Sequence, residues 1–139
     1  MTLLLVLAFA LALPAMAMAR PEFGALGVCA RTPIGSADCP PEAAARALDG
    51  LEPAWGYYFR PGGGDAFAVV HLLATLKDGI ARRLAGDCAA DEETANYVSE
   101  TWAMYVSVDP VDEAMAEDFA TVEGFVGNAV SYLAEGGCE

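Results

Sequence analysis

The sequence predicts an all-α fold: a small disulfide-bridged bundle of three long helices and one short helix, preceded by a signal peptide. Three observations support this expectation. Apolar residues recur at helical spacing through most of the chain, no segment alternates as strands do, and four cysteines occur in 139 residues. Without its leader the chain is long enough for one helical domain, over residues 20–139.

The N-terminal segment has the composition of a secretory signal peptide. Residues 3–13 form the apolar run LLLVLAFALAL, and the sequence AMAMA at residues 15–19 then supplies two overlapping A-x-A cleavage sites. Cleavage is expected before Met18 or before Arg20, which assigns residues 1–19 to the signal peptide and the mature protein to the periplasm or the medium. No basic residue precedes the apolar run, and an uncleaved membrane anchor is the alternative.

The segment between the leader and the long helices is expected to be mostly irregular. Residues 20–40 contain six glycine and proline residues and no helical periodicity, which predicts a loop-rich lead-in. A short helix follows over Glu42–Leu48. The aromatic residues Trp55, Tyr57 and Tyr58 are interpreted as part of a loop that either covers one end of the bundle or anchors a partner.

The three long helices are predicted from apolar spacing and from their end signals. The first covers about Ala66–Ala85, with Asp65 as its N-cap and apolar residues around most of its circumference, and is expected to be the most buried. The second covers about Asp91–Val106 and begins with three acidic residues, which favour the positive end of a helix. The third follows the start signal Asp109-Pro110 and ends at Gly136.

The cysteines are expected to form two disulfides. Short connections favour an up-down-up arrangement, in which the first and third long helices run parallel. Cys88 and Cys138 directly follow the C-terminal ends of these two helices, so Cys88–Cys138 is the preferred pair among three possible pairings, with Cys29–Cys39 as a local bridge. An even count without a C-x-x-C pair argues against a zinc site and a redox centre.

Charge is distributed unevenly along the chain. Of a formal charge of −13, residues 87–139 contribute thirteen acidic and no basic residues, whereas residues 1–86 contribute seven of each. Such a field repels nucleic acid and anionic lipid and attracts cationic proteins or peptides. A surface that is acidic only for solubility, as in salt-adapted proteomes, is the alternative. Besides the three aromatic residues named above, the expected partner-binding residues lie on one continuous anionic face: Asp112, Glu113, Glu117, Asp118 and Glu123.

No catalytic residue, metal site or cofactor is expected. His71 is the sole histidine, and its helix-face neighbours Thr75 and Asp78 suffice to hold it. The acidic residues follow a helix face rather than the two sides of a cleft, and neither a calcium loop nor a complete phosphate loop is present. Gly124 and Gly127 interrupt the last helix and are expected to mark close approach of another helix, within the bundle or from a second subunit.

The second half of the chain also carries a family resemblance. Cys88 is followed by a helix that reaches Tyr105-Val106, then by the Asp109-Pro110 break and by a helix that runs to Cys138. This order resembles the periplasmic immunity proteins that protect bacteria against type VI secretion peptidoglycan amidases. The resemblance implies an exported all-α homodimer that blocks the active site of a secreted amidase.

The favoured function is therefore an exported, non-enzymatic binding protein with an acidic helical face for a cationic protein or peptide. A toxin-neutralising immunity protein is the specific form that the resemblance implies. Two other functions remain open. One is a periplasmic acid-stress or chaperone-like protein that exposes apolar surface as its carboxylates are neutralised, and the other is a small hydrolase that uses carboxylates.

Overall fold

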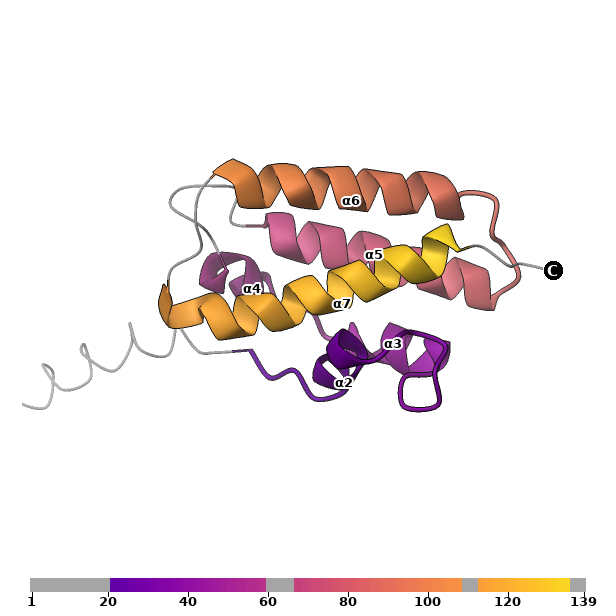
Figure 1. The fold of residues 1–139 in the computed structure, drawn as a ribbon, viewed down its shortest axis with the longest axis horizontal. Coiled ribbons are helices and arrows are strands. Elements are labelled where there is room, and N and C mark those ends of the chain that lie inside the picture. The colour runs from indigo at the N-terminus through magenta and orange to yellow at the C-terminus, as the bar shows by residue number, and fades with distance from the viewer. Residues whose placement is uncertain (1–20, 60–66, 109–112, 136–139) are drawn as a thin grey trace, which may run out of the picture.

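A computed structural model describes residues 21–59, 67–108 and 113–135 of the chain. Helices are the regular elements of this described part, and it contains no strand. Three long helices dominate: α5 (Ala68–Leu84), α6 (Asp91–Val108) and α7 (Ala116–Ala134), the last preceded by the 3-10 turn η1 (Glu113–Met115). In Figure 1, α6 runs opposite to both α5 and α7, so α5 and α7 point the same way. The all-α prediction is confirmed.

Apolar spacing explains which faces of the long helices are buried. Helix α5 buries more of its circumference than a surface helix does, because it contacts α3, α4, α6 and α7. The fully buried apolar residues of α5 are Val69, Leu72, Leu73, Leu76 and Ile80. From the other side, Val98 of α6 and Val122, Phe125 and Leu133 of α7 complete the same core.

The ends of the long helices follow the predicted signals where these are described. Helix α6 begins at Asp91 as expected, with Asp91, Glu92 and Glu93 in its first turn. The predicted N-cap Asp65 and the predicted start signal Asp109-Pro110 lie outside the described residues. Regular α-helix in the last segment starts only at Ala116, later than the predicted start.

The short helices correct part of the expectation. Helix α3 (Pro41–Ala47) lies within one residue of the predicted short helix. The lead-in predicted as loop contains a helix, α2 (Ala25–Arg31), and the aromatic segment predicted as loop forms another, α4 (Pro53–Tyr58). Helix α4 begins with a proline at its first position, where the missing N–H costs no hydrogen bond.

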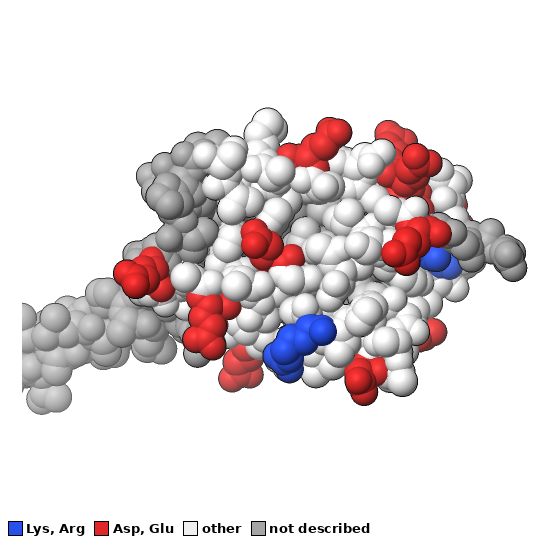
Figure 2. All heavy atoms as spheres, in the orientation of Figure 1, with Lys and Arg blue, Asp and Glu red and all other residues white. Residues whose placement is uncertain are grey.

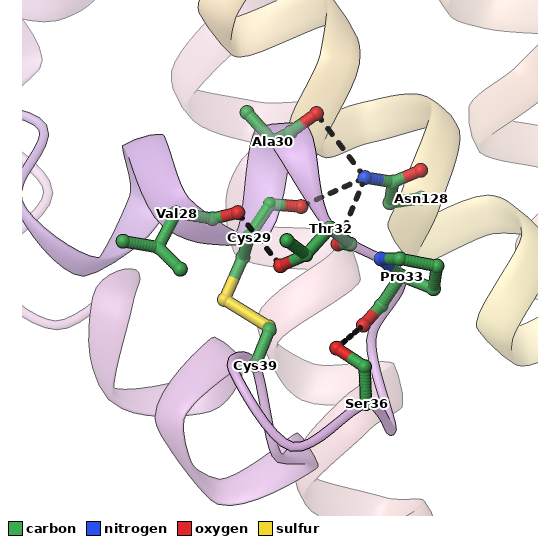
Figure 3. Close-up of a disulfide and its surroundings, with 8 residues drawn as sticks. All are labelled: Val28, Cys29, Ala30, Thr32, Pro33, Ser36, Cys39 and Asn128. Atoms are coloured by element: carbon green, nitrogen blue, oxygen red, sulfur yellow. Dashed lines mark hydrogen bonds between the residues drawn. A yellow bond between two sulfur atoms is a disulfide. The ribbon is translucent and has the colours of Figure 1, made fainter.

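A side chain of α7 completes the C-terminal end of helix α2. The last carbonyls of a helix have no partner within the helix. Here the side-chain amide of Asn128 on α7 donates hydrogen bonds to the carbonyls of Cys29 at 2.8 Å, Thr32 at 3.1 Å and Ala30 at 3.2 Å (Figure 3). The two helices approach so closely that a Cβ on Gly124 would lie 2.9 Å from the Ala30 carbonyl oxygen. This contact supplies the reason for Gly124 that the sequence predicted.

A disulfide joins α2 to the loop before α3. The predicted Cys29–Cys39 bond is present, and both cysteines are buried in the core (Figure 3). It closes a segment with a sequence separation of 10 and fixes α2 beside α3. Cys88 is also disulfide-bonded. Its predicted partner, Cys138, lies outside the described residues, as does the predicted signal peptide.

None of the described helices combines the length and the apolar composition needed to cross a membrane.

Candidate partner-binding surface

The described residues of α6, η1 and α7 include acidic side chains and no basic ones. Within residues 91–108 and 113–135 nine acidic residues and no lysine or arginine occur. Seven of the nine are exposed: Glu92, Glu93, Glu100, Glu113, Glu117, Glu123 and Glu135. Figure 2 shows acidic side chains on the viewed face as separate groups, with uncharged surface and some basic side chains between them. The face is acidic but not the continuous anionic wall that the sequence predicted.

The five predicted acidic contact residues do not act as one group. Glu113, Glu117 and Glu123 are exposed, as expected for a binding surface. Asp112 lies outside the described residues. Asp118 is a correction, because it is only 5 % exposed and accepts a hydrogen bond from the Tyr58 hydroxyl at 2.8 Å. The Asp118 carboxylate therefore ties α7 to α4 rather than facing a partner.

The predicted aromatic contact residues separate in the same way. Trp55 packs edge-on against Phe23 at 5.9 Å between ring centroids, and Tyr58 is engaged by Asp118. Tyr57 differs because it is 52 % exposed and contacts the partly exposed Phe67 ring at 5.2 Å. Tyr57 is therefore the aromatic residue of α4 that is accessible to a partner. Trp55 and Tyr58 instead pack within the molecule, which is the other interpretation that the sequence allowed.

A shallow hollow lies between α6 and α7. Its volume is about 170 Å³, and its lining consists of Ser99, Trp102, Glu123, Val126, Gly127 and Val130. The Trp102 indole N–H donates to the Glu123 carboxylate at 3.2 Å, and the Trp102 ring stacks on Phe119 at 5.3 Å. The hollow thus has apolar walls and one fixed carboxylate at its rim.

Gly127 has no close neighbour that explains it. A Cβ added there would meet nothing within 4 Å, in contrast to Gly124 one turn earlier. The sequence predicted that another helix approaches closely at both glycines. Within the described chain this is so at Gly124 and not at Gly127. Trp102 lies in the apolar stripe of α6, as the sequence predicted, and is only 7 % exposed although it lines the hollow.

His71 is held by a different residue from those expected. Its Nε2 atom lies 2.9 Å from the Tyr97 hydroxyl of α6, whereas the Thr75 hydroxyl donates to the backbone carbonyl of residue 71. Both His71 and Tyr97 are exposed. The pair joins α5 to α6, and no carboxylate of the described residues is hydrogen-bonded to this imidazole.

A buried polar cluster joins the C-terminal ends of α5 and α7 to the start of α6. The Arg83 guanidinium stacks over the Tyr132 ring at 4.1 Å, donates to the Tyr132 carbonyl, and lies 3.9 Å from Asp91. Asp91 is 3 % exposed, and neither of its carboxylate oxygens has a hydrogen-bond partner within the described residues. Burial raises the pKa of Tyr132 above its ordinary value of 10.0; Arg83 opposes this rise and Asp91 adds to it.

In the three described ranges, no group of three or more histidine, cysteine, aspartate or glutamate side chains is placed to hold a metal ion. A scan against protein-family models, a search of curated proteins and a search of solved structures each returned no match for this chain.

Proposed function

We propose that this chain is an exported, non-enzymatic binding protein that takes a cationic protein or peptide on its α6–α7 side. The observation that carries the proposal is the separation of charge along the fold. Within the described ranges the α6, η1 and α7 segments have seven exposed acidic side chains and no basic one, and all five described basic residues lie on α2, α3 and α5.

An acidic surface attracts cationic partners over a distance and does not require one particular contact geometry. Among the described residues the ion pairs are Lys77–Asp49 and Arg83–Asp91, and neither includes an exposed carboxylate of α6 or α7. A surface of one sign accelerates encounter with partners of the opposite sign and repels phosphate-rich polymers. Exposed Tyr57 adds an aromatic side chain of the kind enriched at interfaces.

Capture at two salt concentrations tests this function. The chain, purified from the periplasm of an expressing strain, is immobilised and exposed to periplasmic extract and to medium from competing strains. We expect a basic partner that binds at low ionic strength and is released at about 0.5 M salt, where the screening length falls to a few ångströms. N-terminal sequencing of the same sample tests export, with Met18 or Arg20 as the expected first residue.

Two matched charge variants separate a specific face from general acidity. The first neutralises five exposed acids of α6, η1 and α7: Glu92, Glu93, Glu100, Glu113 and Glu117, each changed to Gln. The second neutralises five exposed acids elsewhere: Glu22, Glu42 and Glu52 changed to Gln, and Asp38 and Asp78 changed to Asn. Both changes remove the same charge, so only the first is expected to abolish capture. Equal losses would show that acidity serves solubility and would overturn the proposal.

The toxin-neutralising role is the specific form that we propose for this binding. The resemblance of the Cys88–Cys138 segment to periplasmic immunity proteins supports it. The test is co-expression of the chain with periplasm-directed peptidoglycan amidases of type VI secretion systems. Protection from lysis by one amidase, lost in the α6–α7 charge variant, is the expected outcome. Lysis by every amidase would refute the immunity role while leaving cationic binding to the capture experiment.

A further inference from the structure

The hollow between α6 and α7 limits the size of the group that a partner can insert between these two helices. Its volume of about 170 Å³ is far below the roughly 300–1,000 Å³ of sites that enclose a small molecule. A single long side chain suits a hollow of this size better than a cofactor or a metabolite. The question is therefore which side chain fits it.

The walls of the hollow favour an apolar stem. Val126 and Val130 of α7 lie along one side, and the Trp102 side chain of α6 forms the other. Gly127 of α7 also lines the hollow and leaves space there, since a Cβ at that position would touch nothing within 4 Å in the described chain. A glycine inside a helix costs about 1 kcal/mol relative to alanine, and no contact within the described chain accounts for this one.

The rim favours a positive charge. The Glu123 carboxylate is exposed and is oriented by the Trp102 indole N–H, which donates to its Oε2 atom. None of the ion pairs in the described ranges includes Glu123. Arginine and lysine combine an aliphatic stem with a cationic head. Arginine also stacks on tryptophan and binds carboxylates through two parallel hydrogen bonds.

We propose that the α6–α7 hollow receives one arginine side chain of the cationic partner. The aliphatic stem lies against Trp102, Val126 and Val130, and the guanidinium reaches the Glu123 carboxylate. This inference rests on the proposed function and deepens it, because it names the side chain that the partner must present.

Short capped peptides test the hollow without the partner. The probe is acetyl-Gly-Arg-Gly amide, and its control carries citrulline, which has the same shape as arginine without the charge. The readout is the pair of indole N–H resonances of the full exported chain. Trp102 lines the hollow and Trp55 packs against Phe23, so Trp55 is an internal reference. We expect a saturable shift of Trp102 alone, with binding of the citrulline peptide about fivefold weaker, as for loss of an exposed ion pair.

Two pairs of variants assign the shift to the hollow. Glu123→Gln removes the charge but keeps an acceptor for Trp102, and Glu117→Gln is its control on an exposed acid of α7 that does not line the hollow. Gly127→Leu fills the hollow from within, and Ala103→Leu adds the same side chain at an exposed site of α6 outside it. Gly127→Leu is expected to lose the Trp102 shift, and Glu123→Gln is expected to weaken binding of the arginine peptide about fivefold, as citrulline does. The two control variants are expected to bind the peptide as the unchanged chain does.

The outcomes also separate this inference from the proposed function. Equal binding of the arginine and citrulline peptides, or a shift that survives both Glu123→Gln and Gly127→Leu, overturns the arginine site. A Trp102 shift that depends on protein concentration alone assigns the hollow to a second copy of the chain and also overturns it. If capture succeeds while the peptides fail, the partner binds elsewhere on the acidic side. If the peptides bind while capture fails, the cationic-partner function is refuted.

Discussion

Two glycines of α7 allow a prediction in which one substitution is the control for the other. Gly124 and Gly127 are both glycines within α7, and alanine at either site gains about 1 kcal/mol of helix propensity. At Gly124 the new Cβ would lie 2.9 Å from the Ala30 carbonyl oxygen and 3.5 Å from the Ala30 Cβ. At Gly127 it would meet nothing within 4 Å.

The difference between the two variants isolates the cost of crowding α2. Overpacking of a well-packed contact costs roughly 1–3 kcal/mol, and backbone atoms give way less easily than flexible side chains. Gly127→Ala is therefore expected to stabilise the chain by about 1 kcal/mol, since only the propensity term changes. Gly124→Ala gains the same helix propensity but also incurs the cost of overpacking. We therefore expect it to be less stable than Gly127→Ala by about 1–3 kcal/mol.

Urea unfolding followed by circular dichroism at 222 nm measures this difference. The free energies of unfolding of the two variants are compared directly, because the slopes are expected to be equal for changes of one methyl group. Equal stabilities, or a more stable Gly124→Ala variant, would refute the close approach of α2 to α7. A destabilised Gly127→Ala variant would refute the open space at the hollow.

Three other changes test contacts that the fold places far apart in sequence. Asn128→Ala removes the hydrogen bonds to the end of α2 and is expected to cost about 1–3 kcal/mol in urea unfolding, as buried carbonyls lose their partner; unchanged stability would contradict this role. Replacing both Cys29 and Cys39 by Ser is expected to cost about 2.7 kcal/mol on the chain-entropy model, for their sequence separation of 10, and a loss well under 1 kcal/mol would contradict it. Burial keeps the Tyr132 phenol neutral above its ordinary pKa of 10.0, so stability is retained below pH 10 and falls as the pH rises through the folded-state value. Arg83→Met is expected to raise that folded-state pKa further in an ultraviolet titration, and a lower pKa would contradict the guanidinium–ring contact.

The long helices were predictable because their signals are local. The apolar spacing of α5, α6 and α7 and the acidic first turn at Asp91 are read from neighbouring residues alone. Helix α2 was missed because Gly24, Gly27 and Pro33 indicate a loop, and its end is completed by Asn128, roughly a hundred residues away. The start of α4 did carry a local signal, the proline at its first position, but the aromatic residues around Gly56 concealed it.

The charge of the candidate site could be predicted from the sequence, but the burial of its residues and the hollow could not. The absence of basic residues on α6 and α7 follows directly from the sequence. The burial of Asp118 does not, because its partner Tyr58 lies 60 residues away, on a helix that was not predicted. The hollow depends on the relative placement of Trp102 and Gly127 on two different helices, which no pattern within one helix specifies.

The contact between α2 and α7 also determines when α2 can pack in its native position during synthesis of the chain. Helix α2 is made early, yet the amide that completes its end belongs to a residue 96 to 99 positions later. Native docking of α2 must therefore wait until almost all of the described chain has been made, because contacts between distant segments form only once both are present. The bridge between Cys29 and Cys39, only 10 positions apart, faces no such delay and can close while α7 is still missing.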